Sequence, residues 1–124
     1  MNLSKYSNLD QQDIESHQEN LINYLEQEKP YLDPDLKLGS LADHLGMPSY
    51  QLSQVINIGC QHNFYDLINS LRIEEAKQKL SNPTTQYQQN ILSIAYDVGF
   101  NSKSTFNVAF KKYTGMTPTQ FKNQ

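Results

Sequence analysis

Apolar residues recur at intervals of three and four positions along most of the chain, which is the spacing of one face of an α-helix. From Leu36 onward no stretch alternates apolar and polar residues in the manner of a strand. Proline, glycine and short polar runs divide the periodic sequence into segments. The pattern predicts an all-α fold of seven helices without a sheet.

The first periodic segment predicts a helix between Asp10, a favourable N-cap residue, and Pro30, which cannot continue a helix. Its apolar stripe is narrow and consists of Ile14, Leu21 and Leu25. We therefore expect this leader to pack lightly on the rest of the domain or against a second copy. Residues 30–35 are expected to form an irregular connector.

Six further helices are expected after the connector. A polar loop over residues 84–89 separates the third of them from the fourth. Caps, glycines and prolines place the six helices at about residues 38–45, 49–56, 63–80, 91–98, 103–114 and from 118 onward.

A motif of seven residues occurs twice, 53 positions apart. The first copy is Leu41-Ala42-x-x-Leu45-Gly46-Met47, and the second is Ile94-Ala95-x-x-Val98-Gly99-Phe100. Each copy predicts a short helix, a tight glycine turn and a second helix, which is a helix-turn-helix unit. A single alanine and glycine at this spacing occurs by chance, so the repetition in register is the stronger evidence.

The motif predicts three kinds of structural residue in each unit: a small residue where the helices cross, a glycine with positive φ at the turn, and a large apolar anchor on the second helix. These residues are Ala42, Gly46 and Leu52 in the first unit, and Ala95, Gly99 and Phe106 in the second. Gly115 is expected to end the long helix of the second unit, and Pro118 to occupy the favoured first position of the final helix.

Longer stretches around the motifs carry a resemblance to a known family. They are residues 41–46, 52–56, 71–76, 94–102 and 106–118, the most distinctive being Ile94-Ala95-Tyr96-Asp97-Val98-Gly99-Phe100-Asn101-Ser102. On these residues the stretch from Leu36 to Phe121 resembles the C-terminal DNA-binding domain of the AraC/XylS family of bacterial transcription regulators. The resemblance implies two helix-turn-helix subdomains joined by a linker helix, each inserting a recognition helix into one of two successive major grooves.

The helix pattern and the resemblance together predict four parts. They are an acidic N-terminal helix and connector over residues 1–35, a first helix-turn-helix subdomain over 36–62, a linker helix over 63–82 and a second subdomain over 83–124. The leader also resembles that of a subgroup in which a membrane-embedded sensor precedes the DNA-binding domain. One interpretation is therefore that the chain is part of a longer protein tethered to the inner membrane.

Two positions depart from the family pattern. The glycine that usually follows the first recognition helix is replaced by Gln61, and Gly59 lies two residues earlier. Either Gln61 adopts a left-handed conformation or the helix ends at Gly59. A position of the second unit that often carries arginine or lysine is Val108, which weakens the case for hydrogen-bonded base reading there but leaves contact with a thymine methyl group open.

With Leu52 and Phe106 facing inward, helical geometry identifies the outward residues that would meet DNA. They are Ser49, Tyr50, Ser53, Gln54 and Asn57 in the first unit, and Lys103, Ser104, Asn107, Val108, Lys111 and Lys112 in the second. Gln54 and Asn107 are suited to bidentate bonding with adenine, and Lys103 to guanine or phosphate. The alternative is that these residues have no binding role and only interact with solvent on exposed helix faces.

Arg72 is the only arginine of the chain and lies in the middle of the expected linker helix, beside Glu74 and Glu75. We expect it to have a structural role, bonding backbone or acidic groups between the subdomains. A contact with DNA phosphate is the alternative.

Charge is unevenly distributed along the chain. The net charge is −3, but residues 1–35 carry −6 and residues 36–124 carry +3. No acidic residue follows Gly99. Phosphate affinity depends on local positive potential, so this division permits a DNA-binding face despite the negative total.

Other classes of function find little support in the composition. Cys60 is the only cysteine, which excludes an internal disulfide and fits a reducing, cytoplasmic setting. With His62 and His44 it provides too few ligands for a zinc site. No nucleophile–base pair or phosphate loop is present, so we expect no enzyme activity, no cofactor and no small-molecule site.

Two classes of function remain in view. The main interpretation is a sequence-specific transcription regulator that binds double-stranded promoter DNA, works with RNA polymerase and dimerises, if at all, through a region outside this chain. The alternative is a helical protein-interaction module that kept the fold but lost DNA binding. The modest basic content and Val108 motivate the alternative.

Overall fold

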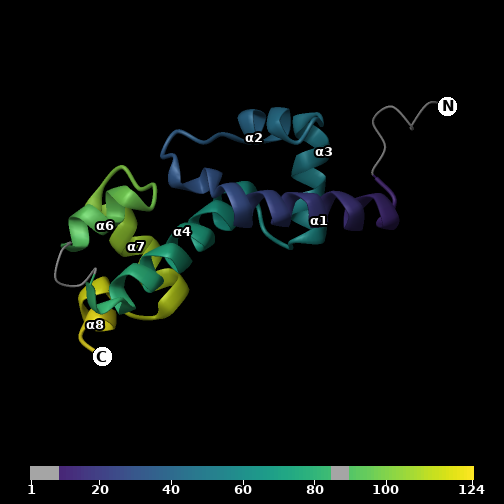
Figure 1. The fold of residues 1–124 in the computed structure, drawn as a ribbon. Helices are drawn as coiled ribbons and strands as arrows, with labels where there is room; N and C mark the ends of the chain where they lie inside the picture. The colour runs from purple at the N-terminus through teal and green to yellow at the C-terminus, as the bar shows by residue number, and fades with distance from the viewer. Residues whose placement is uncertain (1–8, 85–89) are drawn as a thin grey trace. The chain divides into compact units, whose positions relative to one another are not determined.

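The computed structural model describes residues 9–84 and 90–124, and within them it contains helices and no strand. Its elements in chain order are α1 (Gln11–Glu28), η1 (Pro30–Leu32), α2 (Leu38–His44), α3 (Ser49–Gln54), η2 (Val55–Gly59), α4 (Phe64–Ser81), α6 (Ile91–Asp97), α7 (Lys103–Thr114) and α8 (Pro118–Lys122) (Figure 1). The described ranges thus hold the seven α-helices that the sequence predicts, together with the short helical turns η1 and η2. Of the predicted polar loop, Thr84 is helical instead, and residues 85–89 lie outside the described residues.

The ends of α1 follow from its sequence. The Asp10 carboxylate accepts a hydrogen bond from the Asp13 N–H at 2.8 Å and so satisfies one of the free donors of the first turn. Lys29 ends the helix in a left-handed conformation, with φ 48°, and donates its N–H to the Leu25 carbonyl at 3.1 Å. The helix therefore ends just before Pro30, as predicted.

The described residues fall into two compact units, each with its own core. Unit 1 contains the chain up to Pro30 together with Leu36–Leu67. Unit 2 contains Tyr31–Asp35 and Ile68–Gln124. The boundaries of these units differ from those of the four predicted parts. The leader belongs to unit 1, most of the connector belongs to unit 2, and α4 is divided between the two units.

In unit 1, the leader helix is an integral part of the core, so the expectation of light packing was wrong. Its three apolar residues, Ile14, Leu21 and Leu25, are buried, and α1 packs against η2. Val55 and Ile56 of η2 are themselves fully buried. The helices α2 and α3 have seven and six residues, too short to bury their own apolar faces against one another, and α1 supplies the missing side of the core.

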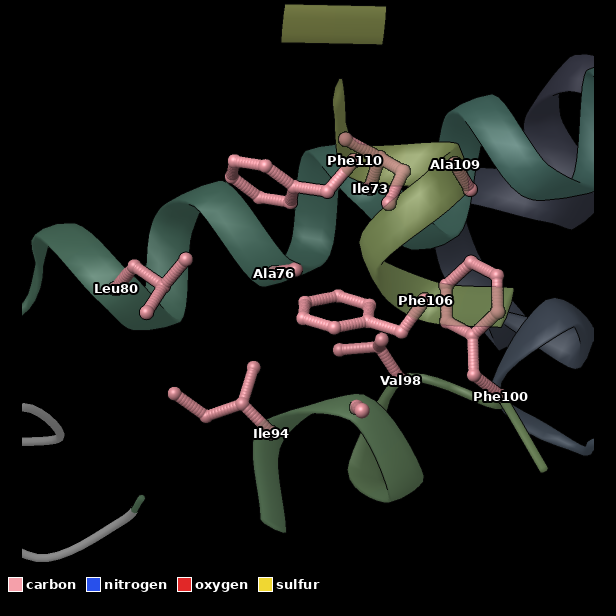
Figure 2. Packing of buried hydrophobic residues seen from close by; sticks show 10 residues of the cluster. Ile73, Ala76, Leu80, Ile94, Val98, Phe100, Phe106, Ala109 and Phe110 are labelled. Atoms are coloured by element: carbon pink, nitrogen blue, oxygen red, sulfur yellow. The ribbon is translucent and has the colours of Figure 1, made fainter. Parts of the chain in front are cut away.

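In unit 2, the core is formed by one face each of α4, α6 and α7 (Figure 2). The buried residues are Ile73, Ala76 and Leu80 of α4, Ile94, Ala95 and Val98 of α6, the turn residue Phe100, and Phe106, Ala109 and Phe110 of α7. The rings of Phe100, Phe106 and Phe110 follow one another at centroid distances of 5.4 and 5.6 Å. Such edge and tilted contacts stabilise a core beyond the area they bury.

Arg72 bonds backbone groups, as predicted, but its partners lie within unit 2 and not between the two subdomains. Its side chain is only 9% exposed, and its guanidinium donates to the backbone carbonyls of Tyr31 at 2.6 Å and Asp33 at 3.0 Å. It also lies 5.7 Å from the centre of the Phe100 ring. Burial lowers the pKa of Arg72, and the Asp33 carboxylate partly opposes that shift. The guanidinium thus fixes the connector residues within unit 2 and is not available to phosphate.

Candidate nucleic-acid interface

The first helix-turn-helix lies in unit 1, where α2 and α3 meet at Gly46. Gly46 has φ 68°, and the next residue, Met47, donates its N–H to the Ala42 carbonyl at 3.1 Å. This left-handed conformation favours glycine, because a side chain would crowd the following carbonyl. Ala42 is buried where the helices meet, and Leu52 is fully buried. The three predicted structural residues of this unit are therefore in their expected places.

The outward face of the first unit runs from α3 into η2. Ser49, Tyr50 and Asn57 are exposed, whereas Ser53 and Gln54 are half-buried. The Asn57 side-chain amide donates to the Ser53 hydroxyl at 3.2 Å. The Gln54 amide oxygen accepts a hydrogen bond from the Leu9 N–H at 3.3 Å, so the start of the leader touches a residue expected to read a base.

The end of the first recognition helix shows how the unusual Gln61 is accommodated. The chain widens into a single π-helical turn, η2, which ends at Gly59. Gln61 then adopts a left-handed conformation with φ 57°. Both of the alternatives open from the sequence therefore occur together. A Cβ atom at Gly59 would lie 2.7 Å from the Gln18 amide oxygen of α1, so a larger residue there would require the Gln18 side chain to move.

The second helix-turn-helix lies in unit 2, where α6 and α7 meet at Gly99. Gly99 has φ 110°, and Phe100 donates its N–H to the Ala95 carbonyl at 3.0 Å. A Cβ atom at Gly99 would lie 2.5 Å from the Tyr31 carbonyl oxygen. Ala95 and Phe106 are fully buried, as predicted. The turn thus has the geometry of the first unit within a more crowded environment.

Caps fix the helices that follow this turn. The Ser102 hydroxyl accepts from the Thr105 N–H at 3.2 Å at the start of α7. Gly115 ends α7 with φ 78° and donates its N–H to the Lys111 carbonyl at 2.8 Å. Pro118 is buried at the first position of α8. Both predictions for this end of the chain are confirmed.

The outward face of α7 combines cationic, polar and aliphatic side chains. Lys103, Ser104, Val108, Lys111 and Lys112 are exposed, and Asn107 is half-buried. The Lys112 ammonium lies 5.3 Å from the centre of the Tyr113 ring, which restrains its direction. Because no acidic residue follows Gly99, three lysines dominate the potential of this helix face.

Two hollows flank Val108 on this face. One, of about 400 Å³, is lined by Asn69, Ser104, Thr105, Val108, Ala109, Lys112 and Tyr113. The other, of about 420 Å³, is lined by Asn107, Val108, Lys111, Lys112 and Thr117. Asn69, Thr105 and Tyr113 are not among the outward residues that helical geometry predicts. Asn69 lies on α4, far from α7 in the sequence, so no local pattern could have placed it beside Val108.

The described part of the chain contains neither a metal-binding cluster nor a helix able to span a membrane. Residues 9–84 and 90–124 contain no group of three or more histidine, cysteine or acidic side chains able to hold a metal ion. Burial raises the pKa of the Cys60 thiol, which keeps it protonated at neutral pH. Across the same ranges, no helix combines the length and the apolar character that spanning a membrane requires.

Comparison with known proteins assigns the family. A family model described as a helix-turn-helix domain matches residues 41–124. The chain belongs to the AraC-type helix-turn-helix family. Among solved structures, the C-terminal domain of AraT, a response regulator from Geobacillus stearothermophilus, is 27% identical with a TM-score of 0.69, covering 89% of this chain and 83% of that one. The C-terminal domain of the two-component response regulator yesN from Fusobacterium nucleatum is 29% identical with a TM-score of 0.71, covering 86% and 98%.

Curated relatives of this AraC-type domain are longer proteins. An uncharacterized HTH-type transcriptional regulator of Staphylococcus aureus (strain COL) is 33% identical over 88 residues, which are 71% of this chain and 11% of that protein. Another, encoded in the cgkA 5' region of Pseudoalteromonas carrageenovora, is 31% identical over 88 residues, which are 71% of this chain and 49% of that protein. The chain thus spans between about a tenth and a half of the length of these relatives.

Proposed function

We propose that this chain is the DNA-binding domain of a transcription regulator, with α3 and α7 as its two recognition helices. The observation that carries the proposal is the repeated geometry. Each unit has a left-handed glycine turn, a fully buried anchor on the helix that follows, and a polar outward face on that same helix. Membership of the AraC-type family supports this function.

The two helices would enter successive major grooves, whose centres are about 34 Å apart on one face of B-DNA. Asn107 would bond an adenine edge, and Lys103 would reach guanine or phosphate. On the first unit, Gln54 would read a base after exchanging its hydrogen bond with Leu9 for one to DNA. Lys111 and Lys112 would supply phosphate contacts, which give affinity without sequence preference.

Further partners follow from the same function. A promoter-bound regulator would act on RNA polymerase in the cytoplasm, and any dimer contact would lie in a region outside this chain. The domain would need no cofactor and carry out no reaction of its own.

The test begins with selection of bound duplexes from a random DNA pool, followed by affinity measurements over a range of salt. Asn107→Ala should weaken binding to the selected site by about 1–3 kcal/mol and binding to random DNA much less. Asn23→Ala, at an exposed position of α1, is the matched control and should change neither. Lys111→Ala should weaken both duplexes similarly and reduce the salt slope by about one.

The same measurements separate the proposal from the protein-interaction alternative. An affinity that does not fall with salt, or the absence of any selected sequence, would favour a module that no longer binds DNA. Equal losses on selected and random DNA for Asn107→Ala would show that α7 does not read bases.

A further inference from the structure

Val108 stands out on the recognition helix of unit 2. Its side chain is 71% exposed, although valine is among the residues most often buried. The other exposed residues of α7 all carry a polar or charged group, namely Lys103, Ser104, Thr105, Lys111 and Lys112. A β-branched residue at an exposed helix position also adds nothing to helix stability. Neither the core nor the helix therefore explains the presence of an aliphatic side chain here.

The surroundings of Val108 form a ridge between two depressions. It lines both hollows described above, with volumes of about 400 and 420 Å³. The methyl groups of Val108 are thus accessible from two sides, with Ala109 and Tyr113 adding apolar surface on one of them. An apolar group packed against this ridge would therefore be shielded from water.

The charges around the ridge indicate what kind of partner it meets. Lys111 and Lys112 are three and four positions along the helix from Val108 and share its side of α7. No acidic residue lies on α7 or beyond it. A polyanion therefore fits this face better than an uncharged apolar partner. In the major groove of duplex DNA, the apolar group that a base edge presents is the 5-methyl group of thymine.

We propose that Val108 reads a thymine of the operator by packing against its 5-methyl group. This inference rests on the proposed DNA-binding function and assigns to one position of α7 a preference for an A·T pair. It gives Val108 a direct role in specificity that needs no hydrogen bond. The neighbouring polar residues of α7 would read adjacent edges by hydrogen bonding.

The experiment uses the duplex selected by the wild-type domain and replaces each thymine in turn by deoxyuridine, which removes only the 5-methyl group. At one position the wild type should lose about fourfold in affinity, the change expected for burying one methyl-sized group. Val108→Ala should bind the parent duplex more weakly and show no further loss at that position. Val108→Ile keeps the aliphatic surface and should retain the loss. Because the side chain is exposed, all these variants should fold.

Two results would overturn the inference without touching the proposed function. One is a wild-type domain that binds the selected duplex selectively but tolerates deoxyuridine at every position. The other is an equal loss in wild type and Val108→Ala at every thymine, which would place the methyl contact on another residue. Absence of selective, salt-dependent binding by the wild type would instead remove the proposed function, and this inference with it.

Discussion

Replacing Arg72 by leucine tests the role of the buried guanidinium most directly. Leucine fills much of the same apolar volume but donates no hydrogen bond. The substitution leaves the carbonyls of Tyr31 and Asp33 without their present donor. It also removes the cation that lies over the Phe100 ring.

The size of the effect follows from the exposure of the two carbonyls. Leaving a buried acceptor unsatisfied costs about 1–3 kcal/mol. Tyr31 is buried and would bear that cost in full, whereas Asp33 is exposed and its carbonyl can bond to water. The cation–π contact adds about 0.5–1 kcal/mol. We therefore expect Arg72→Leu to lower the free energy of unfolding by about 2–4 kcal/mol.

The assay is urea unfolding followed by far-UV circular dichroism, with hydrogen exchange of the unit 2 amides as a local readout. Lys77→Leu is the matched control on the same helix. Lys77 forms a partly exposed ion pair with Glu74 at 3.1 Å, and its loss should cost less than about 1 kcal/mol. At temperatures where Arg72→Leu is folded, its salt slope for DNA should equal that of the wild type. Unchanged stability with a salt slope reduced by about one would refute the structural role and establish a phosphate contact.

Two further substitution pairs test the turns and the leader by the same unfolding assay. Gly46→Ala should lower the free energy of unfolding by about 1–2 kcal/mol, because alanine is strained in the left-handed conformation of this turn. Gly99→Ala should lower it clearly more, because its Cβ atom would also lie 2.5 Å from the Tyr31 carbonyl oxygen. Equal losses for the two variants would contradict the crowding at Gly99. Leu21→Ala should lower the free energy of unfolding by about 2–5 kcal/mol, because Leu21 is fully buried. Its neighbour Ile22 is partly exposed, so Ile22→Ala should cost less than about 1 kcal/mol. A cost below about 1 kcal/mol for Leu21→Ala would mean that the leader is no part of the core.

The helix-turn-helix units could be predicted from the sequence because their signals are local. An alanine, a glycine and an apolar anchor within about a dozen positions fix the crossing, the turn and the inward face. The Asp10 cap acts on an N–H three residues away, so it too could be identified from a short stretch. The candidate DNA contacts followed from the same local geometry once the anchors were placed.

Features that depend on distant segments could not be predicted in detail. The sequence suggested a structural Arg72, but its acceptors are backbone carbonyls about forty positions earlier, which no side-chain pattern marks. The π-helical turn η2 and the left-handed Gln61 arise together where the chain turns from the first unit into α4. Only one of these departures was signalled, by the absence of glycine at that position.

The leader shows how charge and hydrophobicity can point in different directions. Its acidic surface suggests an arm that stays away from DNA, and that expectation depends only on its exposed residues. Its contribution to stability depends on three buried residues, whose stripe is narrow because the core of unit 1 needs only one further face.

Deleting the leader would expose Val55 and Ile56 to solvent. A loss of DNA affinity after such a deletion could therefore result from unfolding as readily as from a lost contact with DNA. The packing of α1 on η2, which carries Asn57, and the hydrogen bond from Leu9 to Gln54 connect the leader directly to the outward face of the first unit. Displacement of α1 would therefore disturb Gln54 and Asn57, which are proposed to face DNA, through the core of unit 1.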